Sequence, residues 1–198
     1  MTARTWAFLG MCSLLVGLTG ACNDQTAPPE PAAPKEQTST MSQMTITSPA
    51  FGPGQKIPAK YTGDGANVSP ALNWTSLPDK TASLALIVDD PDAPRPQPWV
   101  HWVIYDIPPR ASLPENVPAD PRPAAPAGAV QGANTAGKSG YMGPSPPRGH
   151  GTHHYHFKLY ALDRKLDAPP GLTKEKLLDA MKGRVLGQAE FVGTYERK

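Results

Sequence analysis

The spacing of apolar positions along the chain indicates a domain built mainly from β-strands. Residues 83–88 form a continuous apolar run, which is typical of a strand buried on both faces. Residues 99–106 and 153–162 alternate with the two-residue period of a strand. Weaker strand patterns occur at residues 45–47, 71–74 and 190–195. Many short strands separated by Gly and Pro turns predict an all-β-dominated domain, a sandwich or a barrel.

The alternation also predicts which side chains share a face of each strand. In residues 153–162, His153 and Tyr155 stand two positions apart, so an imidazole and a phenol lie side by side. In residues 99–106, strict alternation puts His101 on one face and Trp102 on the other. The face of His101 also holds Trp99, Val103 and Tyr105. The face of Trp102 also holds Val100 and Ile104.

One helix is expected near the C-terminus. Thr173 can cap its first turn, and an apolar stripe follows at Leu177, Leu178 and Met181. Gly183 is placed to end the helix. By contrast, the proline-rich residues 107–132 form a connection longer than most. We interpret that stretch as a bulky surface loop, with a lid over a site as the alternative.

The N-terminal segments have the pattern of an exported, lipid-anchored protein. Residues 1–21 contain an apolar run too short to span a bilayer and read as a signal peptide. Small residues lead into Cys22, which resembles the lipidated cysteine of bacterial lipoproteins; an ordinary secretory signal is the alternative. Residues 22–43 are rich in Pro and Ala and form the expected tether. The domain itself occupies residues 44–198.

Composition narrows the classes of function. The chain has 19 Lys and Arg against 17 Asp and Glu, and its basic residues are scattered, so no nucleic-acid partner is expected. Its two cysteines are Cys12, inside the apolar run of the signal, and Cys22. The domain therefore has no disulfide framework. We expect anchoring in a bacterial envelope membrane through Cys22, with the domain in the periplasm.

Candidate chemistry gathers where the predicted strands begin or end. Asp90 and Asp92 follow a buried strand, and Pro91 and Pro94 stiffen the backbone around them. The glycines of residues 140–151 permit backbone N–H groups to turn toward an anion. A stiff turn with solvated aspartates, histidines satisfied inside the core, and a purely structural glycine loop are the alternatives that the residues leave open.

Two other types of site are weighed and set aside. His150, His153, His154 and His156 lie within a few residues, but neither Cys nor an obvious carboxylate joins them, so no metal site is expected. Ser145 lies between two prolines instead of in the strand–turn–helix that exposes a hydrolase nucleophile. We expect a domain without cofactor or catalysis, with a hydrolase as a remote alternative.

The motifs in combination resemble the phosphatidylethanolamine-binding protein family, also called the Raf-kinase-inhibitor-like family, in its bacterial branch. The resemblance covers the whole domain, 44–198, and rests on these segments: Tyr61–Pro70, Asp90–Pro94, His101–Val103, Gly132–Asn134, Gly140–Pro147, His153–Tyr155 and Phe191–Tyr195. It implies an antiparallel β-sandwich with Greek-key connections and one or two short helices near the C-terminus.

The resemblance also implies a binding site. Its expected residues are Asp90, Pro94, Trp99, His101, Ser145, Pro147, His153 and Tyr155. Such a site takes phosphate-like or carboxylate groups, including phospholipid headgroups. On physical grounds we expect both histidines to supply N–H donors, one of them as imidazolium. Bacterial relatives often have Cys where Ser145 stands, and an acidic and an aromatic residue where Thr135 and Ala136 stand, which predicts a different pocket rim.

The leading hypothesis is a membrane-tethered domain that binds small anions or headgroups in the cell envelope. The rival is a protein-interaction module, an inhibitor of an envelope protease or a regulator of signalling, that makes its contact through the exposed residues 107–131. The bacterial branch often forms homodimers, so a homodimer is a further expectation.

Overall fold

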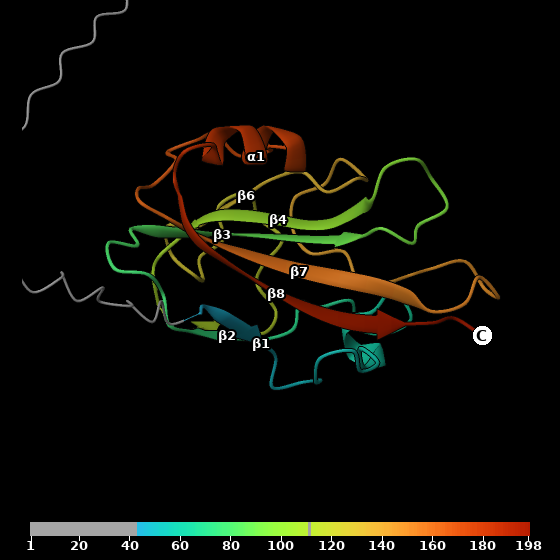
Figure 1. Ribbon diagram of the computed structural model, residues 1–198. Helices are drawn as coiled ribbons and strands as arrows, with labels where there is room; N and C mark the ends of the chain where they lie inside the picture. The colour runs from blue at the N-terminus through green and yellow to red at the C-terminus, as the bar shows by residue number, and fades with distance from the viewer. Residues whose placement is uncertain (1–42, 111) are drawn as a thin grey trace, which may run out of the picture. The chain divides into compact units, whose positions relative to one another are not determined.

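The computed structural model describes residues 43–110 and 112–198 (Figure 1). The signal peptide, Cys22 and nearly all of the tether lie outside the described residues. Two antiparallel sheets make up the fold, and their strands are β1 (Thr45–Thr47), β2 (Leu72–Thr75), β3 (Ser83–Asp90), β4 (Trp99–Ile107), β5 (Ser112–Leu113), β6 (Val130–Gln131), β7 (His153–Leu162) and β8 (Val185–Tyr195). The predicted antiparallel sandwich is confirmed.

The strand order explains how distant motifs meet. The smaller sheet has the order β1-β2-β5, and the larger has the order β6-β4-β3-β7-β8. β3 therefore lies between β4 and β7, although some 45 residues separate β4 from β7 along the chain. The end of β3, the start of β4 and the start of β7 fall at the same end of the larger sheet, because all three strands are antiparallel neighbours.

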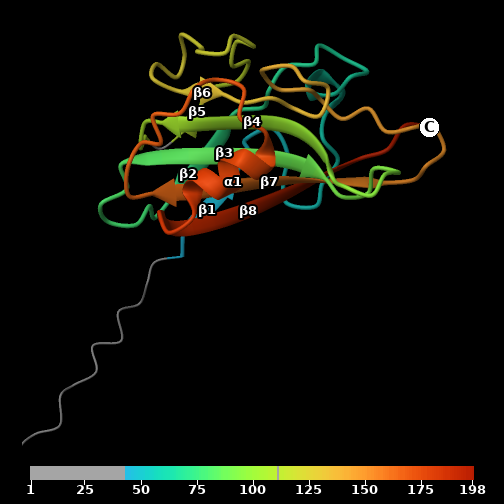
Figure 2. The same cartoon turned by 90° about the horizontal axis from the view of Figure 1, so that it is seen from above.

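Two apolar cores hold the layers together. One lies between the two sheets and includes Trp74, Trp102 and Phe157. The other lies between the larger sheet and helix α1 (Lys174–Met181), and includes Val103 and Leu177. Figure 2 shows α1 lying across the outer face of the larger sheet. Because β3 contributes to both cores, all its residues are buried, as the continuous apolar run predicts.

Helix α1 begins and ends as its sequence indicates. The Thr173 hydroxyl accepts a hydrogen bond from the backbone N–H of Lys176, at 3.4 Å. Leu177 and Met181 are buried against the sheet. Gly183, just beyond the helix, has φ +71°, a conformation that a residue without Cβ adopts at no steric cost. A 3-10 turn, η1 (Ala59–Tyr61), is a further short element.

A β-bulge in β4 changes the face on which His101 lies. Val88 of β3 pairs with Trp102, but the next residue, Asp89, pairs with Val100, so His101 is an extra residue in β4. Val103 packs under α1, whereas Trp102 packs between the sheets. The bulge brings His101 to the side of Trp102 and sends Val100 to the side of Val103. The prediction that His101 shares a face with Val103 and Tyr105 was therefore wrong.

The long connection from β4 to β7 is held firmly to the body. It contributes β5 to the smaller sheet and β6 to the larger. The buried Gln131 side chain accepts a hydrogen bond from Trp102 Nε1 at 2.7 Å, and its amide group donates to the carbonyls of Pro118 and Asp120. These contacts fit a fixed loop, which is the interpretation favoured from the sequence over a lid.

We predict that Gln131→Met lowers the free energy of unfolding by about 2–4 kcal/mol, because Trp102 Nε1 and two loop carbonyls lose their buried partner. Urea unfolding followed by Trp fluorescence measures the change. The matched control is Gln188→Met at an exposed position of β8, whose free energy of unfolding should stay within about 0.5 kcal/mol of the parent value. Equal stability of the two variants would contradict the anchoring role of Gln131.

Candidate binding site

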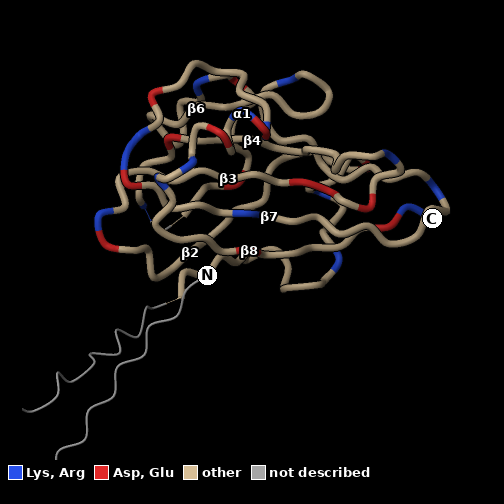
Figure 3. The backbone as a smooth tube through the Cα atoms, turned by 45° about the horizontal axis from the view of Figure 1, so that its top comes forward, with Lys and Arg blue, Asp and Glu red and all other residues tan. Residues whose placement is uncertain are grey.

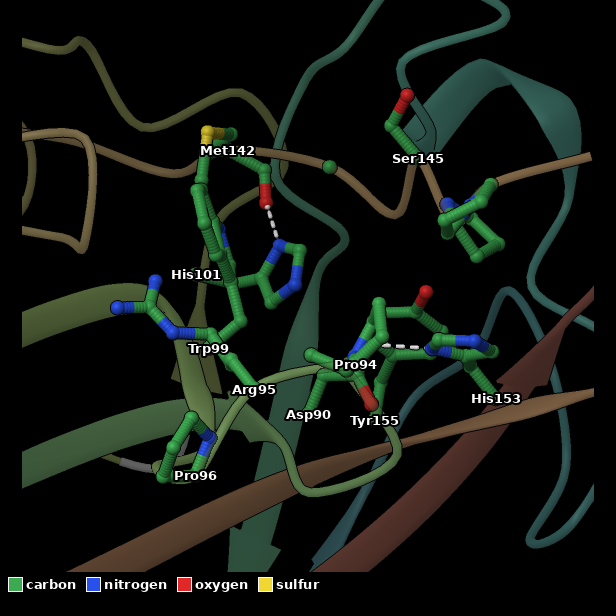
Figure 4. Close-up of a pocket in the computed structure, with 14 residues that line it drawn as sticks. Asp90, Pro94, Arg95, Pro96, Trp99, His101, Met142, Ser145, His153 and Tyr155 are labelled. Carbon is green, nitrogen blue, oxygen red and sulfur yellow. Dashed lines mark hydrogen bonds and ion pairs between the residues drawn. The ribbon is translucent and has the colours of Figure 1, made fainter. Parts of the chain in front are cut away.

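A cavity of about 520 Å³ opens at the end of the larger sheet where β3 ends and β4 and β7 begin. Figure 4 shows its side chains gathered from these strands and from the loops beside them. Every pocket residue expected from the sequence lines this cavity, namely Asp90, Pro94, Trp99, His101, Ser145, Pro147, His153 and Tyr155. Convergence of these residues is thus a property of the fold, whereas their binding of a ligand stays a prediction.

A buried carboxylate–imidazole pair forms the floor. His153 Nδ1 donates to Asp90 Oδ2 at 2.7 Å, and the two residues are 1% and 3% exposed. The other nitrogen, His153 Nε2, lies 2.8 Å from Nδ1 of the exposed His150, so one of these two nitrogens donates a hydrogen bond to the other. The result is a hydrogen-bonded chain from Asp90 through His153 to the surface at His150.

The turn that contains Asp90 and Asp92 is bound to β7 through the Asp92 carboxylate. Asp90 Oδ1 accepts the backbone N–H of Asp92 at 2.8 Å, which is an Asx-type turn. Asp92 Oδ2 in turn accepts from both the backbone N–H and Nδ1 of His154, at 2.8 and 2.7 Å. Partial burial opposes ionisation of Asp92, but the bonds from His154 outweigh it and lower the pKa of Asp92. Asp92 is therefore a structural residue that fixes Asp90.

His101 is oriented by one backbone carbonyl. Its Nδ1 lies 2.6 Å from the carbonyl oxygen of Met142, and since a carbonyl only accepts, Nδ1 carries the proton. The Nε2 edge of the ring faces the cavity in Figure 4. His101 is 4% exposed, and this burial lowers its pKa, outweighing the Met142 carbonyl and the charge of Asp90. Burial thus favours the neutral ring, in which Nε2 is the acceptor.

Tyr155 brings a buried hydroxyl that finds no partner among the described residues. Its side chain is 1% exposed and its ring meets the His101 ring edge-on, with centroids 5.1 Å apart. Burial, followed by the nearby Asp90 charge, raises the pKa of Tyr155, so its O–H stays protonated. A buried hydroxyl without a partner costs about 1–3 kcal/mol, so an oxygen in the cavity would relieve that cost.

The glycine- and proline-rich loop is bound to the body through its backbone, which corrects one expectation. The N–H of Gly143 donates to Asn67 Oδ1 at 2.7 Å, and the N–H of Gly149 donates to the Arg197 carbonyl at 3.1 Å. These amides were expected to turn toward an anion, but they are already satisfied. The motif around Tyr61–Pro70 thus serves to seat the loop.

Ser145 lines the cavity, but its hydroxyl points away from Asp90 and His153 in Figure 4. Its oxygen accepts from Arg197 Nη1 at 3.1 Å, while the same guanidinium makes a two-point contact with Asp64 at 3.0 and 2.6 Å. The bonds from Arg197 and Tyr195 lower the pKa of Asp64. The C-terminal residues therefore hold the far wall of the pocket.

The expectation that both histidines offer N–H donors to a guest is not met at either Nδ1, and for His101 Nε2 it stays a prediction. The Nδ1–H groups of His101 and His153 are taken by Met142 and Asp90, and His153 Nε2 is engaged by His150. The sequence reveals which rings converge, but not which nitrogen each ring leaves free, because that depends on backbone groups distant in sequence.

Comparison with known proteins identifies the family of the chain. The sequence model described as "Phosphatidylethanolamine-binding protein" matches residues 47–196. The chain belongs to the phosphatidylethanolamine-binding protein family. A UPF0098 protein of Methanothermobacter thermautotrophicus is 51% identical over 155 residues, which cover 78% of this chain and 99% of that relative. LppC of Mycobacterium tuberculosis, which carries the name of a lipoprotein, is 40% identical over 202 residues, covering 98% of this chain and 96% of LppC.

Solved structures of family members have the same fold. The Chlamydia trachomatis homologue CT736 is 42% identical with a TM-score of 0.71, covering 79% of this chain and 99% of that one. Escherichia coli YbcL, described as a new member of the mammalian family, is 32% identical with a TM-score of 0.73, covering 79% of this chain and 100% of YbcL.

The structure also shows where two residues near the rim of the cavity lie, Thr135 and Arg95. Thr135 does not line the cavity; its hydroxyl accepts the N–H of Val100 at 2.7 Å and so closes the edge of β4 beside the bulge. Arg95, which the sequence analysis did not select, does line the cavity and lies over the Trp99 ring at 4.9 Å. The signal available for Arg95 was its place directly after the aspartate–proline turn.

A charged group on the opposite face of the sheet was missed as well. Asp89 is fully buried next to Asp90 in sequence but points toward α1, where Lys158 and Lys174 donate to it. Burial opposes its ionisation, but the two lysines outweigh burial and lower the pKa of Asp89. Figure 3 shows Lys and Arg residues interspersed with Asp and Glu residues along the backbone of the described chain. Within residues 43–110 and 112–198, no group of three or more His, Cys, Asp or Glu side chains is arranged to hold a metal ion.

We predict that Gly143→Ala lowers the free energy of unfolding by about 2–3 kcal/mol, because an added Cβ would come within 2.5 Å of the Tyr61 carbonyl and 2.8 Å of Asn67 Oδ1. Chemical denaturation measures it. In the control Gly52→Ala, the new Cβ meets only the flexible end of Gln55, so a loss below about 1 kcal/mol is expected. A tolerated Gly143→Ala would show that the loop is not seated on Tyr61–Asn67.

Proposed function

We propose that this domain binds small anions or phospholipid headgroups, such as phosphate or phosphoethanolamine, and that it acts as a binding protein tethered to an envelope membrane. The observation that carries the proposal is the Tyr155 hydroxyl, which is buried at the cavity floor without a partner among the described residues. Such a group is costly in the empty protein and is compensated when a ligand oxygen accepts from it.

The rest of the cavity suits an anion with an organic substituent. Asp90 accepts from His153 Nδ1 and from the backbone N–H of Asp92, so both of its carboxylate oxygens already hold a partner. The guanidinium of Arg95 stands at the rim as a cation. Pro94, Trp99 and Pro147 supply apolar walls, and about 520 Å³ is far more than one phosphate group fills. A polar floor under apolar walls is typical of a small-molecule site.

The arrangement around Ser145 supports binding without hydrolysis. A serine nucleophile needs a neighbouring base to take its proton. The partner of the Ser145 hydroxyl here is the guanidinium of Arg197, which donates a hydrogen bond and cannot accept a proton.

The membrane attachment rests on Cys22 and on the relative named as a lipoprotein, whose alignment covers 98% of this chain. No helix within residues 43–110 and 112–198 is long and apolar enough to cross a membrane. Attachment of the described domain through lipid at Cys22 and the tether that follows it is therefore the arrangement we propose.

We predict that Tyr155→Phe weakens the affinity for phosphoethanolamine about tenfold, since a hydroxyl-to-anion hydrogen bond contributes about 1.5 kcal/mol or more. Isothermal titration calorimetry measures it. The same substitution should leave the free energy of unfolding unchanged or raise it slightly, because the hydroxyl has no partner to lose within the described protein.

Tyr105→Phe is the matched control for this experiment. The Tyr105 hydroxyl donates to the Pro169 carbonyl on the α1 side of the sheet, away from the cavity. Its removal should lower the free energy of unfolding by about 1 kcal/mol and leave affinity unchanged. Full affinity of Tyr155→Phe for phosphoethanolamine, or no binding by the parent protein, would refute the proposed function.

For the anchor, we predict that Cys22→Ala moves the protein from the membrane fraction to the soluble fraction and abolishes labelling by a radioactive fatty acid, because the acylated thiol is gone. Cys12→Ala, inside the apolar run of the signal, should retain both membrane association and label. Unchanged labelling of Cys22→Ala would exclude Cys22 as the lipidated residue.

A further inference from the structure

The loop that joins β3 to β4, residues 91–98, projects beyond the end of the larger sheet (Figure 1). Most of its residues are exposed, and four of the eight are proline, which has no backbone N–H. The N–H of Asp92 is already used, since it donates to Asp90 Oδ1 at 2.8 Å. The N–H of Arg95 donates to the Ala93 carbonyl at 2.7 Å. The loop therefore has few backbone donors that would lose water against an apolar surface.

An indole and a guanidinium stand together at the base of this loop. Trp99 is partly exposed, whereas Trp74 and Trp102 are 3% and 0% exposed. The Arg95 guanidinium lies 4.9 Å from the centroid of the Trp99 ring, and both side chains line the cavity (Figure 4). Trp is enriched at membrane–water interfaces, and Arg recognises phosphate groups. The pair is therefore suited to the headgroup layer of a bilayer.

Basic residues on neighbouring segments share this end of the domain. Arg148 lies on the loop that leads into β7 and donates to the carbonyl of Lys198, so that loop and the chain end lie together. Arg95, Arg148 and Lys198 are all exposed. None of the three belongs to an ion pair within residues 43–110 and 112–198. Their charges are therefore available to an anionic surface.

Two acidic side chains at the same end are already engaged. Asp92 is paired with His154 at 2.7 Å. Asp64 is paired with Arg197 at 2.6 Å. Glu196 is a further acid here and is half-buried. Three exposed cations against this one acid leave the end with a net positive charge.

The opposite end of the larger sheet differs in charge. The turn that follows β7 carries Asp163, Arg164, Lys165 and Asp167, so its charges balance. Asp163 and Arg164 are paired with each other at 3.0 Å. The positive charge and the partly exposed indole thus occur together at the end that holds the cavity.

We propose that residues 91–99 are a docking tip for an anionic lipid bilayer. The Trp99 ring and the loop prolines enter the headgroup layer, while Arg95 and Arg148 contact lipid phosphates. The mouth of the cavity then opens onto the bilayer surface. This inference uses the membrane attachment of the proposed function and goes beyond it, since docking by the tip needs no ligand in the cavity.

Attachment at Cys22 is compatible with this contact. The chain enters the domain at Gln43, which lines the same groove as Gln188 of β8. From Gln188 to Tyr195, which pairs with the first residue of β7 near the mouth, the strand rises about 23 Å. The chain between Cys22 and Gln43 can extend to about 65 Å, so it can pass along the domain and reach the bilayer that the tip contacts.

Fluorescence of Trp99 tests the proposal on the lipidated protein, purified from its own membranes and reconstituted into nanodiscs. Trp6 is expected to leave with the signal peptide, so Trp99 is the tryptophan placed to respond. In discs with about one-third phosphatidylglycerol we expect a blue shift and about twofold or more quenching by brominated lipid, relative to phosphatidylcholine discs. Salt at about 0.5 M should remove the difference, because it screens surface charge.

A matched pair of charge reversals locates the contact. Arg148→Glu should lower the ratio of docked to undocked protein about tenfold or more, since each basic residue near an anionic surface contributes about fivefold. Lys165→Glu makes the same change of charge at the opposite end of the sheet and should dock like the parent. Protein that carries no lipid is tested by co-sedimentation with vesicles of the same two compositions.

Equal quenching of Trp99 in anionic and neutral discs, or equal losses in Arg148→Glu and Lys165→Glu, would overturn the inference. Saturating soluble phosphoethanolamine separates docking from capture of a headgroup. Docking that persists supports the tip, and docking that disappears would show that a captured headgroup alone holds the domain at the surface. Calorimetry with phosphoethanolamine decides the proposed function independently of all these results.

Discussion

The register shift in β4 is the constraint on which the pocket depends. If β4 paired evenly with β3, His101 would point toward the core under α1, where Val103 and Tyr105 lie. The extra residue at the bulge brings it instead to the side of Asp90 and Tyr155. The backbone around the bulge is held on both sides, by Thr135 on the N–H of Val100 and by Met142, whose N–H donates to the His101 carbonyl.

The two faces of β3 have separate electrostatic roles. Asp89 and Asp90 are adjacent and both buried, yet one secures α1 through Lys158 and Lys174 and the other receives His153 in the cavity. Because strand side chains alternate, one short acidic segment places one carboxylate against α1 and the other in the cavity. The polar groups of the floor are nearly all paired with one another, which leaves His101 Nε2 and the Tyr155 hydroxyl to meet a guest.

Much of the fold could be predicted from the sequence because strand periodicity is a local property. Residues 153–162 coincide with β7, and Thr173 and Gly183 bound α1 as expected. The first part of β8 was missed, since Val185 and Leu186 are exposed and Gly187 carries no side chain to mark a face.

The expected convergence of the pocket residues came from resemblance to the family, and the structure brings all of them together. The bulge at His101, the use of loop amides by Asn67 and Arg197, and the position of Arg95 depend on contacts between distant segments, which a local pattern does not contain.

The central claim is that a phosphoryl group accepts a hydrogen bond from Tyr155 at the floor of this cavity. A crystal structure of the protein with phosphoethanolamine tests it most directly. The account predicts a phosphoryl oxygen within hydrogen-bond distance of the Tyr155 hydroxyl, with the ethanolamine toward the Trp99 wall. Density for the ligand elsewhere on the protein, or a cavity that stays empty at saturating concentration, would contradict it.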